Sequence, residues 1–245
     1  NVPKEVTVTV TASPTKGLEA TLALAERLAG HGYNVVPHVS ARSVVDSSNL
    51  VEIVERLRSA GIKEVFVPAG DPDTPAGPYD SALSLLKELQ SSGHPFERVG
   101  ITGYPESHPR IDDDLTIQAM WDKRQYADYM VSNLCFDPTT ISRWIRRVRK
   151  RGVALPLYVG LAGPVEATKL LNMASKIGVA ESRRFAGRHL SWFAHLGAPG
   201  GYDPSRLLTK LSATLLDPDA GVEGVHIFTF NQVQKTEAWR RSLLS

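Results

Sequence analysis

Polar side chains follow the apolar, strand-like runs of this 245-residue chain. Most of them form hydrogen bonds without titrating strongly near neutral pH. Such a set suits holding a heteroaromatic ligand by its ring edges better than it suits metal chemistry. The candidates are Thr11, Ser13, His38, Ser40, Asp71, Tyr104, Glu106, His108, Asn133, Asn231 and Gln232.

Asp71 is the main catalytic candidate. It follows Ala69-Gly70 at the end of an apolar run and precedes Pro72-Asp73. A carboxylate placed there favours a role in the reaction, and the alternative is a simple turn cap, which aspartate also favours. His38 leaves a similar choice open. Without a paired acid it is either a ligand contact, which we favour, or a histidine in the core or at its edge whose hydrogen bonds are made within the protein.

Metal and thiol chemistry are not indicated. His108 lies two residues after Glu106, but no third ligand has a readable spacing and the sequence contains no H-E-x-x-H. The single cysteine, Cys135, lies within an apolar run and lacks the context of a nucleophile. We therefore predict a small buried side chain at this position.

Two basic segments receive different interpretations. Residues 143–151 are rich in arginine, but Trp144, Ile145 and Val148 form a stripe at helical spacing. This pattern predicts the solvated outer face of a helix and not a phosphate or RNA site. A second group could bind an acidic ligand tail and consists of Arg183, Arg184 and Arg188.

Composition excludes more than it identifies. A net charge of +2, from 28 basic and 26 acidic residues, is too small for a nucleic-acid footprint. No apolar stretch is long enough to span a bilayer, and no signal-like segment opens the sequence. We expect a cytoplasmic protein with a small-molecule substrate, and a homo-oligomer remains open.

Seven short apolar runs alternate with helical patterns. Near-continuous apolar runs are typical of parallel strands buried on both faces. One helical stripe is predicted by Leu50, Ile53, Val54 and Leu57, with Asn49 and Glu52 as its capping pair, and a second by Ala82, Leu85, Leu86 and Leu89. Glycines at 32, 61, 93, 152 and 178 are expected to end helices. The predicted strands are 6–11, 34–40, 64–70, 98–103, 129–136, 156–160 and 222–230.

This alternation predicts a (β/α)₈ barrel. The first six strand starts are about one βαβ unit, or ~30 residues, apart. The longer last gap holds predicted extra helices at 181–196 and 204–215, within about 181–215. No G-x-G-x-x-G follows the first strand, which disfavours a Rossmann domain. We expect one barrel domain over 1–245 whose first β/α unit is missing, because seven strands do not close it.

Several strand ends resemble those of methylenetetrahydrofolate reductases, in order and in spacing, over essentially the whole chain. The most specific is Gly103-Tyr104-Pro105-Glu106-Ser107-His108-Pro109. The others are 37–40 (PHVS), 69–71 (AGD), 132–137 (SNLCFD), 160–165 (GLAGPV) and 226–231 (HIFTFN).

The resemblance implies reduction of 5,10-methylenetetrahydrofolate to 5-methyltetrahydrofolate with NAD(P)H, NADH being favoured, normally through FAD. It implies that Asp71 is catalytic and lies near the flavin and folate rings, and that Asn133 replaces a folate-contacting glutamine. Tyr104, Glu106 and Gln232 are the other expected substrate contacts. The positions expected to line the cofactor pocket are Thr11, His38, Ser40, Asp71, Tyr104 and His108.

The sequence departs from the family pattern at several positions where the family has basic residues. Ala69 stands where the family usually has arginine, Gln232 replaces another common arginine, and Trp121 and Asp122 fall where a basic pair contacts the flavin phosphates. Lys123 and Arg124 could substitute only if the helix shifts. Because a pyrophosphate needs charged or backbone donors, these departures favour direct hydride transfer from NAD(P)H without FAD.

Three alternatives stay open at this point. One is the same reaction run through FAD, and another is a tetrahydrofolate-dependent methyltransferase or demethylase that needs no nicotinamide. The third is a non-catalytic folate- or flavin-binding subunit that acts through a partner chain.

By the resemblance, the proton donor is a glutamate on the family's first strand, whereas residues 6–11 match its second. We therefore expect a strand carrying a glutamate before Asn1. Replacing that glutamate should abolish reduction and spare folate binding, as measured by NAD(P)H oxidation and by a binding titration. Full turnover by the variant would contradict this expectation.

Overall fold

The computed structural model describes residues 2–12, 16–106, 113–165 and 202–244. Two units divide the chain. We call residues 3–102 and 119–131 the N-terminal unit, and residues 1–2, 103–118 and 132–245 the C-terminal unit. Helix α4 (Asp113–Lys123) begins in the C-terminal unit and ends in the N-terminal one.

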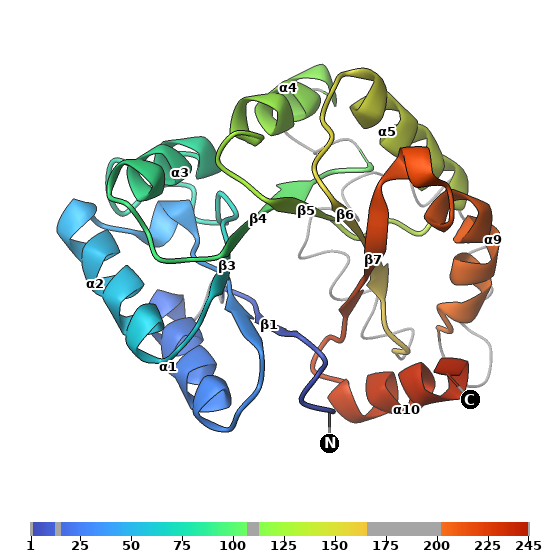
Figure 1. The fold of residues 1–245 in the computed structure, drawn as a ribbon, viewed down its shortest axis with the longest axis horizontal. Helices are drawn as coiled ribbons and strands as arrows, with labels where there is room; N and C mark the ends of the chain where they lie inside the picture. The colour runs from blue at the N-terminus through green and yellow to red at the C-terminus, as the bar shows by residue number, and fades with distance from the viewer. Residues whose placement is uncertain (1, 13–15, 107–112, 166–201, 245) are drawn as a thin grey trace. The chain divides into compact units, whose positions relative to one another are not determined.

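Parallel strands form the centre of the N-terminal unit (Figure 1). β1 (Val8–Val10) pairs with β2 (Val35–Pro37), and a parallel bridge from His38 to Phe66 leads on to β3 (Glu64–Phe66). β3 is parallel to β4 (Arg98–Gly103), and β5 (Tyr129–Ser132) is the next neighbour of β4. Every residue of β2 and of β5 is buried, as expected for strands covered on both faces.

The helices of this unit are α1 (Gly17–Gly30), α2 (Ser47–Ser59) and α3 (Ala82–Ser91). α2 buries Leu50, Ile53 and Leu57, and α3 buries Ala82, Leu85, Leu86 and Leu89. The helical stripes predicted from the sequence are therefore confirmed, although Val54 of the first stripe is only half-buried. α1 and α2 lie side by side in Figure 1, and Arg56 joins them by ion pairs with Glu19 at 2.7 Å and Glu26 at 2.8 Å.

The predicted capping pair of Asn49 and Glu52 is wrong. α2 begins earlier because Asp46 is its N-cap and accepts a hydrogen bond from Asn49 N at 2.8 Å. Asn49 Oδ1 in turn accepts from Val45 N at 3.3 Å, so Asn49 stabilises the cap from within the first turn. The predicted helix-ending glycines at 32, 61, 93 and 152 are confirmed by φ values of 77°, 71°, 69° and 79°. Gly178 lies outside the described residues.

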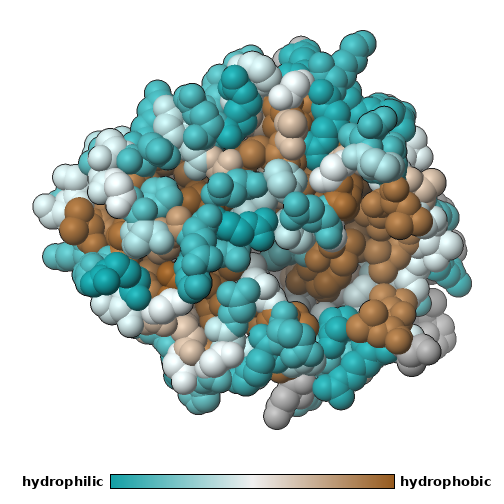
Figure 2. Space-filling model, viewed as in Figure 1, coloured by the Kyte–Doolittle hydropathy of each residue, from teal (hydrophilic) through white to brown (hydrophobic). Residues whose placement is uncertain are grey.

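The C-terminal unit holds α5 (Pro138–Lys150), β6 (Leu157–Ala162), α9 (Ser205–Leu215), η2 (Pro218–Ala220), β7 (Val222–Phe228) and α10 (Val233–Leu244). β6 and β7 are parallel, with Gly160 opposite His226. β7 has no fully buried residue and exposes Val225 to 38%. Figure 2 shows an apolar area over this strand.

All seven predicted strands are present, although most are shorter than the apolar runs that predicted them. α9 confirms the extra helix expected at 204–215, whereas the one expected at 181–196 lies outside the described residues. The single barrel domain and its missing first unit stay predictions. In the described residues, no helix is long and apolar enough to cross a membrane.

The basic segment on α5 has the predicted arrangement, with one exception. Trp144, Ile145 and Val148 are buried, and Arg143 and Arg146 are exposed. Arg149, however, turns to main-chain carbonyls. It donates to Ala220 O at 2.9 Å, Gly221 O at 3.2 Å, Val153 O at 2.7 Å and Leu155 O at 2.8 Å. This side chain thus ties η2 to the segment between α5 and β6.

Replacing Arg149 should destabilise the fold. We expect Arg149→Ala to lower the free energy of unfolding by about 2–4 kcal/mol, because half-buried carbonyls lose a charged donor. Arg146→Ala, on the exposed face of the same helix, should change it by less than about 0.5 kcal/mol. Urea denaturation measures both, and equal effects would contradict the role given to Arg149.

Candidate active site

In the N-terminal unit, the predicted residues follow the ends of β1, β2 and β3. Thr11 is exposed, and its carbonyl accepts from the Thr21 hydroxyl at 3.4 Å. His38 is half-buried and packs against Phe66 with ring centroids 4.7 Å apart. Its main-chain N–H donates to Val10 O at 2.9 Å, which fixes its position beside β1.

The glycine between Ala69 and Asp71 lets the loop backbone approach Ser40 closely. Ser40 is 2% exposed, and its hydroxyl donates to Ala69 O at 3.4 Å. Gly70 has φ +102°, and a Cβ built there would lie 1.9 Å from Ser40 Oγ. Only glycine fits this close approach and this backbone conformation. Asp71 follows directly and is exposed.

In the C-terminal unit, Asn133 and Glu106 lie on neighbouring strand ends. Asn133 N donates to Gly103 O at 2.7 Å, and its side-chain Oδ1 accepts from Leu134 N at 2.8 Å. The Cys135 thiol donates to Glu106 Oε1 at 3.4 Å. Tyr104, which lies between Gly103 and Glu106 in the sequence, is half-buried.

Burial sets the protonation of the Glu106–Cys135 pair. Desolvation raises the pKa of Glu106, and the nearby charge of Asp137 raises it further against the lowering effect of the Cys135 hydrogen bond. Desolvation also raises the pKa of Cys135, whose side chain is fully buried. The predicted burial of Cys135 is confirmed, and its thiol is held toward the protonated form. The raised pKa of Glu106 likewise favours its neutral, proton-donating form.

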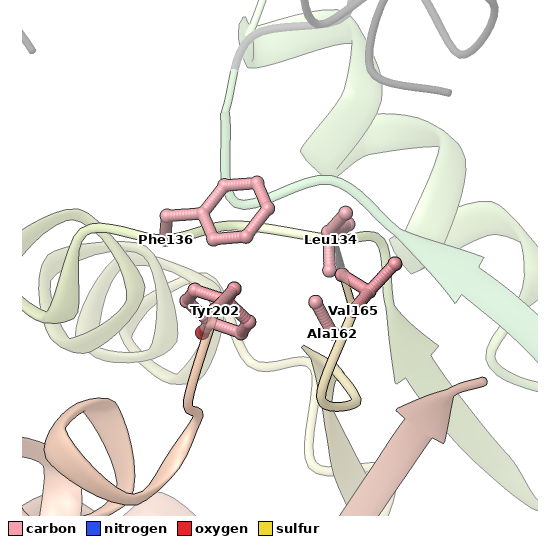
Figure 3. Close-up of a cluster of buried hydrophobic side chains, with 5 residues drawn as sticks. All are labelled: Leu134, Phe136, Ala162, Val165 and Tyr202. Carbon is pink, nitrogen blue, oxygen red and sulfur yellow. The ribbon is translucent and has the colours of Figure 1, made fainter. Parts of the chain in front are cut away.

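Figure 3 shows a cluster of buried apolar side chains, which we call the apolar wall. It includes Leu134 and Phe136, the two neighbours of Cys135 in the sequence. Phe136 and Tyr202 meet edge to face with centroids 5.5 Å apart. Phe228 and Phe230 pack against the cluster from β7 and its end. This wall was not predicted, because the expected site residues were chosen among polar side chains. Its members are Leu134, Phe136, Ala162, Val165 and Tyr202.

A tight turn places Gln232. Phe230 and Asn231 have φ values of 50° and 60°, and Gln232 N donates to Thr229 O at 2.7 Å. The half-buried Gln232 thus lies directly before α10.

The two cations that could replace a missing basic pair are both engaged elsewhere. Lys123 is 8% exposed, and burial lowers its pKa to about 8. The Arg124 guanidinium lies 3.4 Å from the centre of the Trp121 ring and donates to Trp121 O at 2.7 Å. The helix shift that would present them is not seen at these residues.

Other predicted residues cannot be placed. Ser13, His108 and the three arginines at 183, 184 and 188 lie outside the described residues. Within the described ranges, no group of three or more His, Cys, Asp or Glu side chains could hold a metal ion.

Residues 1–182 match the family model for methylenetetrahydrofolate reductase, which is well over half of the chain. The chain belongs to the methylenetetrahydrofolate reductase family. Its fold class is accordingly α/β, of the (β/α)₈ type predicted from the sequence. The matched range contains the predicted site residues except Asn231, Gln232 and the three arginines at 183, 184 and 188.

Curated relatives of the methylenetetrahydrofolate reductase family are distant and much longer. "Methylenetetrahydrofolate reductase 2" of Saccharomyces cerevisiae is 22% identical over 197 residues, covering 75% of this chain and 32% of the relative. "Methylenetetrahydrofolate reductase (NADH) 1" of Arabidopsis thaliana is 25% identical over 126 residues, covering 44% and 21%. "Probable methylenetetrahydrofolate reductase (NADPH)" of Caenorhabditis elegans is 20% identical over 196 residues, covering 76% and 29%. The chain thus spans about a third or less of these relatives.

The raised pKa of Glu106 predicts a pH-dependent cost to stability. Because the folded state holds this proton more tightly than the unfolded state, wild-type stability falls as pH rises from about 4 through the folded pKa. The stability advantage of Glu106→Gln over wild type should therefore grow between about pH 4.5 and pH 8.

Urea midpoints at the two pH values measure this difference. The control is Glu52→Gln, at an exposed position on α2, whose difference from wild type should stay constant. A pH-independent effect of Glu106→Gln would show that the carboxyl ionises freely.

Proposed function

We propose that this chain carries the catalytic site for reducing 5,10-methylenetetrahydrofolate to 5-methyltetrahydrofolate with NAD(P)H. The family match over residues 1–182 carries this proposal. In the reaction, the bond between the bridging carbon and one nitrogen breaks, that nitrogen takes a proton, and the carbon takes a hydride. The nicotinamide that gives the hydride is oxidised.

Each predicted residue has a proposed role in this reaction. The Asp71 carboxylate faces positive charge that develops as the ring opens, which a fixed anion stabilises. Asn133, Tyr104, Glu106 and Gln232 contact the folate, and the aromatic side chains of the apolar wall suit its planar rings. Thr11, His38, Ser40, Tyr104 and His108 are the proposed contacts of the redox cofactor, together with Asp71.

FAD, the family's usual electron carrier, fits the described residues poorly. Trp121 and Asp122 occupy the place of the basic pair, Lys123 is buried, and Arg124 stacks on Trp121. Each charge-assisted bond lost to the pyrophosphate forfeits ~1.5–3 kcal/mol. We therefore favour direct transfer of the hydride from the nicotinamide to the folate, for which positioning of the two rings supplies much of the rate.

NADH is our preferred reductant. The relative from Arabidopsis thaliana is named for NADH and that from Caenorhabditis elegans for NADPH, so the two nucleotides must be compared directly.

A spectrum and an assay of the full-length protein test the cofactor. We expect a preparation without visible flavin absorption that oxidises NADH, faster than NADPH, when methylenetetrahydrofolate is present, with no gain from added FAD. A yellow protein with FAD-dependent turnover would overturn the flavin-free reaction and keep the reductase. No oxidation of either nucleotide, with or without FAD, would overturn the reductase itself.

Asp71→Asn should lower kcat about 100-fold or more, because the negative charge that stabilises the opening ring is lost. The protein should stay folded, because the side chain is exposed. Asp73→Asn, two residues on in the same loop, is the matched control and should keep most of its activity. Steady-state NADH oxidation measures both. Wild-type turnover by Asp71→Asn would exclude a catalytic role for this carboxylate.

A further inference from the structure

The loop that carries Asp71 has little packing of its own. It runs from Ala69 to Asp80 between β3 and α3 without a helix or strand. Residues 71–74 are all exposed, and Tyr79 near its far end is buried. Such a segment needs hydrogen bonds from outside to hold one conformation.

Arg42 supplies these bonds from the 3₁₀ turn η1 (Ala41–Ser43), which begins four residues after the end of β2. Its Nε donates to Asp80 O at 2.9 Å. Its Nη1 donates to Pro72 O at 2.9 Å and to Asp73 O at 3.3 Å. One guanidinium therefore binds the loop just after Asp71 and again at its far end.

The main chain of Arg42 binds the same loop. Arg42 N donates to Ala69 O at 2.9 Å, and Arg42 O accepts from Ala76 N at 2.9 Å. Together with the side chain, this gives contacts on both flanks of Asp71. The three side-chain bonds go to carbonyl oxygens, so none of them uses the Asp71 carboxylate.

We propose that Arg42 is a positioning residue that holds the 69–80 loop so that the Asp71 carboxylate meets the reacting folate. This inference rests on the function proposed for Asp71. The planar guanidinium can serve carbonyls in two directions at once, which a lysine ammonium on a flexible stem cannot reproduce. Misplacement of a reacting group by about 1 Å can cost ~100-fold in rate.

We call the hydrogen bonds from Arg42 to the 69–80 loop the Arg42 clamp. Two close approaches between this loop and residues 40–45 add to it. A Cβ on Gly70 would lie 1.9 Å from Ser40 Oγ, and one on Gly77 would lie 1.9 Å from Val45 O. These contacts set how near the backbones come, whereas Arg42 fixes the direction of the loop between them.

Kinetics of Arg42→Ala and Arg42→Lys test the proposal. We expect kcat to fall about 10- to 100-fold in Arg42→Ala, with a smaller change in KM for NADH, and an intermediate kcat in Arg42→Lys. Added guanidinium ion at a low, non-denaturing concentration should restore part of the activity of Arg42→Ala. Arg58→Ala is the control, since Arg58 is exposed and pairs with Glu55 on α2.

A double mutant separates action through Asp71 from general damage. If Arg42 acts through Asp71, Arg42→Ala combined with Asp71→Asn should be no slower than Asp71→Asn alone. Multiplied losses would overturn the proposal.

Hydrogen exchange keeps the clamp testable apart from the activity. Amides in residues 69–80 should exchange at least tenfold faster in Arg42→Ala than in wild type or Arg58→Ala. Unchanged exchange would overturn the clamp even in an active enzyme. An inactive wild type with faster exchange in the variant would overturn the proposed function, and with it the positioning role, while leaving the contacts established.

Discussion

Burial of the strands on both faces is the constraint on which the rest of this structure depends. A strand such as β5, with every residue buried, accepts a polar side chain only where that side chain finds a partner, as Ser132 does by accepting a hydrogen bond from Gly160 N. Asn133 follows β5, His38 follows β2, and the Asp71 loop follows β3, each as the covered run ends. The polar residues predicted for the site therefore follow the carboxyl ends of the strands, where burial on both faces ends.

The same constraint explains why the loops after the strands need hydrogen-bond partners from outside themselves. A segment that leaves a strand end gives up its ladder of hydrogen bonds and needs other partners for its carbonyls. Arg42 serves the loop after β3 in this way, and Arg149 does the same for η2 and the segment before β6. The side chains of both arginines donate these hydrogen bonds to main-chain oxygens, so both act as structural links rather than as ion-pair partners.

The sequence predicted what depends on periodicity. The seven strands are marked by apolar runs and the stripes of α2, α3 and α5 by helical spacing, and the structure contains all of them. Features that depend on side chains meeting through space could not be found in this way. The Glu106–Cys135 contact, the carbonyl partners of Arg42 and the apolar wall join residues that lie far apart in the chain. The cap at Asp46 was missed for a local reason, because Asn49 is an equally good capping residue and only the backbone decides between them.

The buried state of Cys135 makes this protein convenient for chemical labelling. It is the single cysteine of the chain, its side chain has no exposed area, and desolvation keeps the thiol protonated. A maleimide or a spin label that reacts with thiolates would therefore leave the native residue alone and attach only to a cysteine introduced on the surface. Probes could then be attached to chosen loops of the folded protein without first removing its own thiol.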